Sequence, residues 1–165
     1  MVVEVYRSWA PRGADRLHHL VAAHYFDNVR FHRVLLSDGV AQFGINGDTA
    51  VTAAWVTRVI LDDPVTQSNA RGTLTFAMRG PNTRNFQLFF NRTDNRRLDI
   101  QGFAPVGKVI SGMAAVDSLY AGYGDGPPGG SDGPNQRDIA SQGNAYLLKE
   151  FPKLDYIKTA RFVNP

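Results

Sequence analysis

The chain has 165 residues, 43% of them hydrophobic and 20% charged, a composition typical of a single globular domain spanning residues 1–165. The formal net charge of +3 comes from arginines scattered along the chain, which argues against a nucleic-acid-binding surface. The absence of cysteine excludes disulfides and thiol catalysis, and no apolar run reaches the roughly 18 residues of a membrane span.

The first part of the chain is predicted to contain three strands and one helix. Residues 2–6 have the β-branched and aromatic composition of a strand. After a break at residues 10–13, apolar residues recur at three- and four-residue steps from Ala14 onwards, which predicts a helix. Residues 31–34 and 40–43 follow as two strand pieces around a turn.

The middle of the chain is predicted to form strands after an irregular stretch. Residues 44–69 show no regular period, and we expect the neighbouring carboxylates Asp62 and Asp63 to lie in a solvated loop. Residues 72–77 alternate as a strand. Residues 86–90 form another strand, too apolar on both faces to lie at a sheet edge.

The last part of the chain contains a second helix and a long loop. Residues 103–110 read as a bent strand, and Ser111 is expected to cap the helix that follows. Residues 123–138 are rich in glycine and proline, and a surface loop of that length is either functional or mobile. A short helix over 144–151 and a closing strand over 156–163 complete the pattern.

Many short strands with two amphipathic helices favour a mainly β fold. We expect a closed or nearly closed antiparallel β-barrel with helices over its ends. No internal repeat and no linker divides the sequence, so residues 1–165 are predicted to form one domain.

Arg33 is the candidate functional residue, because it lies in an apolar, β-prone run with no carboxylate nearby in sequence. A guanidinium carries a permanent charge and five donors in a fixed fork. The residues alone leave two interpretations open. Arg33 either faces solvent on an amphipathic strand or donates hydrogen bonds to a substrate carbonyl or amide in a dry pocket. His32 points to the opposite face of the strand and is expected to be structural or at the surface.

The sequence carries no signal for a metal or a cofactor. The spacings of His18, His19 and His24 place no two of them on adjacent turns of one helix face, and no acidic cluster accompanies them. No dinucleotide fingerprint and no serine-hydrolase elbow occurs. We therefore expect neither a metal site nor a cofactor.

A series of short segments resembles the cyclophilins, which are peptidyl-prolyl cis/trans isomerases. Each segment alone is a weak signal, but the segments follow one another in the order of that family and at nearly the spacing of that family. The segments are Phe-His-Arg-Val at 31–34, Gln-Phe-Gly at 42–44, Gly-Asp at 47–48, Gly-Thr-Leu at 72–74, Gly-Pro-Asn-Thr at 80–83, Gln-Leu-Phe at 87–89, Leu-Asp at 98–99 and Gly-Lys-Val-Ile-Ser-Gly-Met at 107–113. The resemblance covers nearly the whole chain. The Gln-Phe-Gly segment and the glycine-rich loop resemble a bacterial-type branch of the family.

The resemblance implies an enzyme that catalyses rotation about Xaa-Pro peptide bonds in proteins and so assists folding. Arg33 would be the catalytic donor to the prolyl nitrogen. The implied substrate-binding residues are Val40, Gln42, Ala77, Met78, Arg79, Gln87, Phe89, Leu98 and Phe103, with Phe103 standing where many relatives carry histidine. For Phe89 and Leu98 the competing interpretation is plain core, because buried aromatics and leucines are common.

Three departures from the family pattern lead to further expectations. The chain begins at what resembles the family's second strand, so the barrel lacks its first strand. An open seam would invite a homodimer through the exposed edge, or a strand from the C-terminal extension. The interval from Arg33 to Gln42 is one residue longer than usual, and Val40 is expected to replace the missing pocket-floor phenylalanine. Arg97 stands where cyclosporin-sensitive members often carry tryptophan, so we expect weak cyclosporin binding.

The expected partners are proline-containing peptides and unfolded proteins, with no nucleic acid and no membrane. With no visible signal peptide, the expected location is the cytoplasm. The alternative function is a proline-peptide binding module of the same fold with little or no turnover. A third possible function is that of a scaffold component, with the exposed sheet edge as its interaction surface.

Overall fold

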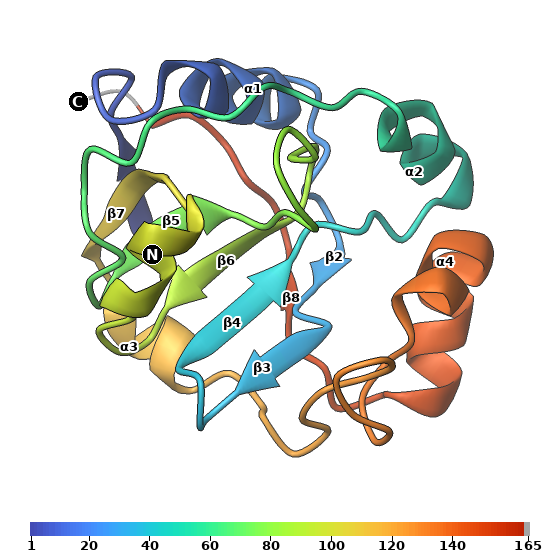
Figure 1. Cartoon of the computed structure of the whole chain (residues 1–165). Helices are drawn as coiled ribbons and strands as arrows, with labels where there is room; N and C mark the ends of the chain where they lie inside the picture. Colours follow the sequence, from blue (N-terminus) through green and yellow to red (C-terminus); the bar gives the residue numbers. More distant parts are fainter. Residues whose placement is uncertain (164–165) are drawn as a thin grey trace.

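The computed structural model describes residues 1–163, and its core is a six-stranded antiparallel sheet (Figure 1). The strand order is β1-β7-β5-β6-β4-β3. These strands are β1 (Val2–Val5), β3 (Arg33–Leu35), β4 (Val40–Phe43), β5 (Thr73–Phe76), β6 (Leu88–Asn91) and β7 (Pro105–Ser111). A separate two-stranded sheet pairs β2 (Val29–Arg30) with β8 (Tyr156–Ile157).

The two faces of the large sheet have different roles. Side chains of successive strand residues point to opposite faces, so each strand supplies both. One face carries the main core, to which the strands contribute Val34, Ala41, Phe43, Leu74, Phe76, Leu88 and Phe90. The other face carries a smaller, separate apolar cluster, made of Leu35, Val40, Phe89 and Leu98 with Ala77 and Phe103 packed against it. The candidate functional site lies on this second face.

Helix α1 (Pro11–Ala22) covers the main core through Ala14, Leu17 and Leu20. The helix begins at Pro11, three residues before the start predicted at Ala14. Proline suits the first helical position, where its missing N–H costs no hydrogen bond.

The expectation that the neighbouring carboxylates of residues 62 and 63 are solvated is wrong for Asp63, which is 4% exposed. Its carboxylate accepts hydrogen bonds from the backbone N–H groups of Arg12 and Gly13, at 3.1 and 2.9 Å. It also faces the buried guanidinium of Arg84 at 3.2 Å. Asp63 therefore caps the start of α1 from about fifty residues away, a contact that local pattern does not reveal.

Helix α2 (Thr49–Val56) lies within the stretch for which the sequence shows no period. Asp48 caps it by accepting a hydrogen bond from the Ala50 N–H at 2.8 Å. Only Thr52 of this helix is fully buried, so no apolar stripe marks it in the sequence.

Helices α3 (Met113–Asp117) and α4 (Gln136–Glu150) differ in detail from their predictions. Gly112, not Ser111, precedes the first residue of α3. Helix α4 is longer than predicted and bends at Gly143, which has φ +62°. A Cβ there would lie 2.1 Å from the Gly47 carbonyl oxygen, so the glycine allows α4 to approach the segment that leads into α2.

The mainly β fold with helices is confirmed, and the sheet stays open between its edge strands β1 and β3. The expectation that a C-terminal strand covers the open edge is wrong, since β8 pairs with β2 instead of β1. Helices α2 and α4 pack side by side (Figure 1). Among residues 1–163 no helix has both the length and the hydropathy needed to cross a membrane.

Candidate active site

Strand register places Arg33, Gln42 and Phe89 in one row on the same face of the sheet. Arg33 lies opposite Gln42 in the β3–β4 pair, and Gln42 lies opposite Phe89 in the β4–β6 pair. Val40 shares that face because it lies two positions from Gln42 on β4, and Gln87 lies two positions from Phe89, directly before β6. The segments of the predicted site therefore converge because the strands pair, although they are far apart in sequence.

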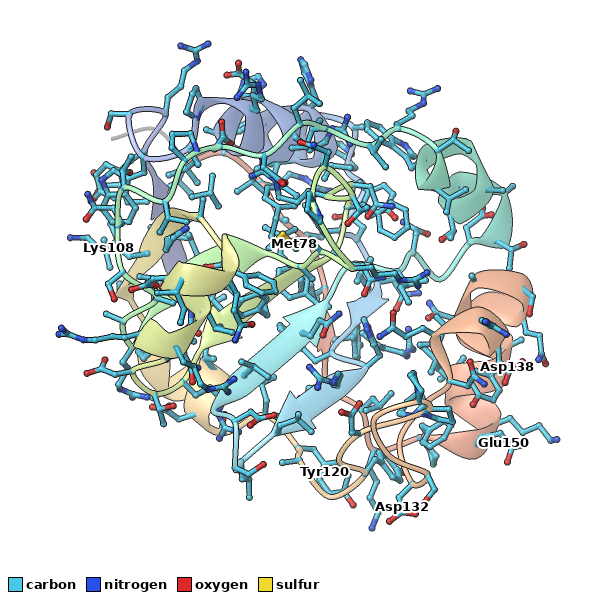
Figure 2. The ribbon with its side chains drawn as sticks, viewed as in Figure 1. Met78, Lys108, Tyr120, Asp132, Asp138 and Glu150 are labelled. Carbon is cyan, nitrogen blue, oxygen red and sulfur yellow. The ribbon has the colours of Figure 1, made fainter. Side chains whose placement is uncertain are left out.

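A groove of about 690 Å³ runs along this face. All ten predicted site residues line it: Arg33, Val40, Gln42, Ala77, Met78, Arg79, Gln87, Phe89, Leu98 and Phe103. Figure 2 shows Met78 near the middle of the molecule, on the segment that leaves β5. Helices α2 and α4 also line the groove, through Thr52, Val56, Gln136 and Ala140.

An apolar slot forms one part of the groove. The rings of Phe89 and Phe103 meet edge to face, with centroids 5.8 Å apart. Leu98 and Val40 complete the same cluster, which is separate from the main core. Phe89 and Leu98 are therefore buried and also line the groove, and their role in substrate binding stays a prediction.

A buried polar network supports the slot from behind. The side-chain amide of Asn69, which is fully buried, donates hydrogen bonds to the Phe103 carbonyl and to Asp99, each at 2.8 Å. Its amide oxygen accepts a hydrogen bond from the Thr75 hydroxyl at 2.8 Å. Because Asp99 and Leu98 belong to the same 3-10 helix, η1 (Arg96–Gln101), this network fixes two walls of the slot.

A chain of hydrogen bonds links Arg33 to α4. Nη1 of Arg33 donates to Oε1 of Gln42 at 3.3 Å, and Nε2 of Gln42 donates to Oε1 of Gln87 at 2.9 Å. Nε2 of Gln87 in turn donates to Oε1 of Gln136 at 3.2 Å. These hydrogen bonds hold the side chains of Arg33, Gln42 and Gln87 in one orientation.

Asp125 is a groove residue that the sequence did not predict. Nε and Nη2 of Arg33 donate to its two carboxylate oxygens, each at 2.8 Å. The hydrogen bonds from Arg33 hold the pKa of Asp125 below its usual value, against the opposing effect of burial. The only sequence signal for this contact was the long glycine-rich loop that contains Asp125.

Arg97 and Asp38 also line the groove and pair with each other at its rim, at 3.3 Å. About half of each side chain is exposed. The guanidinium of Arg97 therefore places a charged, hydrated group beside the apolar slot.

His32 lies behind the site and is buried. Of the two placements predicted for it, structural or at the surface, it has the structural one. Burial, with a smaller contribution from the nearby positive charge of Arg33, lowers its pKa from 6.5 to about 4. His32 is therefore a neutral structural side chain near pH 7. Among residues 1–163 no three His, Asp or Glu side chains form a group that could hold a metal ion.

The family model described as "Cyclophilin type peptidyl-prolyl cis-trans isomerase/CLD" matches residues 1–141. The chain belongs to the cyclophilin family. The family and the enzyme class predicted from the sequence are thereby confirmed.

Relatives of this cyclophilin occur in bacteria and plants. A peptidyl-prolyl cis-trans isomerase of Acinetobacter baylyi is 31% identical over 71% of this chain and 64% of its own length. One from Arabidopsis thaliana is 30% identical over 75% of this chain and 80% of its own length. Because both kingdoms are represented, the bacterial-type branch stays a prediction.

Solved cyclophilin structures share the fold. A Cryptosporidium parvum cyclophilin type peptidyl-prolyl cis-trans isomerase superposes with a TM-score of 0.67 at 22% identity, covering 99% of this chain and 91% of its own. A second structure of that protein, determined in the presence of the dipeptide Ala-Pro, superposes with a TM-score of 0.61 at 24% identity over 81% of this chain and 84% of its own.

Proposed function

We propose that this cyclophilin catalyses cis–trans rotation about Xaa-Pro bonds in protein substrates, with Arg33 as the catalytic donor. The observation that carries the proposal is the position of Arg33 at the groove beside the apolar slot of Phe89, Leu98 and Phe103. Proline-containing peptides are the ligands of this family, and the Cryptosporidium relative was crystallised with Ala-Pro. The slot of this chain is of the apolar kind that a pyrrolidine ring requires.

The chemistry needs no nucleophile and no bond cleavage. The Xaa-Pro amide has partial double-bond character and a rotation barrier of about 18–20 kcal/mol. A hydrogen bond from Arg33 to the prolyl nitrogen would favour the pyramidal, deconjugated state in which rotation is easy. A preorganised donor of this kind can contribute about 3–4 kcal/mol, a factor of 10²–10³ in rate.

The remaining groove residues divide between the two sides of the proline. Phe89, Leu98, Phe103 and Val40 would hold the ring while the preceding carbonyl moves. Gln42 would orient Arg33 or bind the peptide backbone. The side chains of Ala77, Met78, Arg79 and Gln87 would receive the residues that precede the proline.

The test is the exchange rate between cis and trans forms of an Ala-Pro peptide, measured by NMR with catalytic amounts of the protein. Isomerisation should accelerate, at a rate nearly flat from about pH 6 to 9, because an arginine side chain keeps its charge in that range. Peptide binding without acceleration would contradict the proposal and favour the alternative, a proline-peptide binding module.

Cyclosporin is expected to bind weakly. The charged, half-exposed Arg97 beside the slot would have to be desolvated by an apolar ligand, which costs free energy. Replacement Arg97→Trp should strengthen binding, measured by fluorescence titration. A low-nanomolar affinity of the unchanged protein would contradict this expectation.

A homodimer through the open sheet edge is the further partner that we propose. Strand β1 pairs only with β7 among the described residues, which leaves its other edge free to pair with a second copy. Light scattering should give a dimer mass that falls on dilution. A monomer mass at every concentration would refute the dimer.

A further inference from the structure

The loop between α3 and α4 brings a carboxylate directly onto the proposed catalytic arginine. Asp125 lies 92 residues from Arg33 in sequence and accepts hydrogen bonds from its Nε and Nη2, each at 2.8 Å. Both side chains are mostly buried, with 28% of Arg33 and 22% of Asp125 exposed. A side-on, bidentate pair of this kind fixes the plane of the guanidinium as well as its position.

The loop is folded closely around Asp125. The Gly133 N–H donates to the Asp125 carbonyl at 2.9 Å. A Cβ on Gly130 would lie 2.5 Å from that carbonyl oxygen, and one on Gly129 would lie 2.5 Å from a carboxylate oxygen. These glycines therefore permit the close approach that places the carboxylate, and the glycine-rich composition of the loop has a purpose at the site.

The contact leaves Arg33 able to serve a substrate. Of its five N–H groups, two are donated to Asp125 and one to Gln42. Two remain, one on each terminal nitrogen, and Arg33 still lines the groove. The pair thus fixes the side chain without using all of its donors.

We propose that Asp125 is a positioning residue, which holds the Arg33 guanidinium in the orientation that its free N–H groups need to reach the prolyl nitrogen. This inference rests on the proposed function. An arginine side chain has many rotamers, and a donor that is held in place before reaction needs no reorganisation in the transition state. Loss of the carboxylate should therefore lower turnover and leave peptide binding in the apolar slot largely intact.

The experiment compares kcat and KM of Asp125→Ala with those of the wild type. We expect kcat to fall about tenfold with KM changed less than about twofold. Asp125→Asn retains one acceptor and should give an intermediate kcat. Gly129→Ala keeps the carboxylate but displaces it, so its kcat should also fall. Unchanged or increased kcat in Asp125→Ala would overturn the proposal, and an increase would make Asp125 a restraint on the enzyme.

The matched control is Asp117→Ala. Asp117 also binds an arginine through two hydrogen bonds, from Nη1 and Nη2 of Arg71 at 2.9 and 2.7 Å, but at the exposed surface away from the groove. Its loss should leave kcat and KM unchanged. A kcat loss equal to that of Asp125→Ala would overturn the assigned role.

A second readout follows Arg33 itself. The NMR signal of the Arg33 Nε–H should be protected from exchange with water in the wild type and lose that protection in Asp125→Ala. Lost protection with unchanged kcat would overturn the positioning role and leave the proposed function standing. A wild-type protein with a protected Nε–H and no isomerase activity would instead refute the proposed function.

Discussion

Arg33 and Gln42 lie directly opposite each other across strands β3 and β4, with Nη1 of Arg33 3.3 Å from Oε1 of Gln42. By its resemblance to the cyclophilins, the chain is expected to carry one residue more than usual between Arg33 and Gln42, and the turn between these strands would hold it. The turn absorbs that residue, because Leu35 still pairs with Val40. The polar end of the groove therefore keeps its register, and Val40 lies on the slot side of β4.

Replacement Phe103→Ala should weaken peptide binding more than it changes turnover. Phe103 forms one wall of the slot and meets Phe89 edge to face. Losing the contact of one aromatic ring with a proline should cost about 1–2 kcal/mol, which raises KM about tenfold. The control is Ile100→Ala, since Ile100 is 92% exposed on the neighbouring 3-10 helix. Unchanged KM in Phe103→Ala would show that the proline ring binds elsewhere.

The stability of the protein should fall between about pH 6.5 and pH 4 because of His32. The pKa of His32 is lowered to about 4 in the folded chain. Between these pH values the unfolded chain therefore binds a proton at His32 that the folded chain does not bind. The contribution of His32 to the free energy of unfolding is fully present above the pKa of the unfolded chain and decreases as the pH falls. This difference in pKa between the folded and the unfolded chain corresponds to a loss of about 3 kcal/mol in the free energy of unfolding by pH 4.

Urea unfolding of the wild type and of His32→Phe at several pH values measures this effect. The variant should lose the pH-dependent part of the unfolding free energy over that range. His24→Gln, at an exposed histidine, should behave like the wild type. Parallel pH profiles for the wild type and His32→Phe would contradict the assignment.

Replacement Asp63→Ala should destabilise the fold strongly. It removes the acceptor for two backbone N–H groups of α1 and leaves the Arg84 guanidinium, with 2% of its side chain exposed, without one of its carboxylate partners. Breaking a buried pair of this kind costs about 3–5 kcal/mol. Thermal unfolding checks this result. The exposed pair of Arg7 and Asp15 provides the control, because Asp15→Ala should leave stability nearly unchanged.

The parts of the molecule that sequence predicts are those where a local pattern and a strand pairing agree. The apolar, β-prone residues of β3, β4, β5 and β6 indicate strands, and the register of those strands brings Arg33, Gln42 and Phe89 together. The other predicted site residues came from the family resemblance, and in the structure all of them line the same groove.

The missed features depend on contacts that no local pattern records. Asp63 caps a helix from about fifty residues away, and Asp125 reaches Arg33 over 92 residues. Helix α2 is mostly exposed and lacks an apolar stripe, so its period is weak. For Asp63 and Asp125 the deciding interaction comes from the tertiary fold.

The most direct test of the account is kcat/KM of Arg33→Ala on an Ala-Pro peptide, compared with that of the wild type. Removal of the donor beside the slot should lower kcat/KM by about 10²–10³, with the circular dichroism spectrum unchanged. Wild-type kcat/KM in a folded Arg33→Ala protein would contradict the central claim that this arginine performs the catalysis.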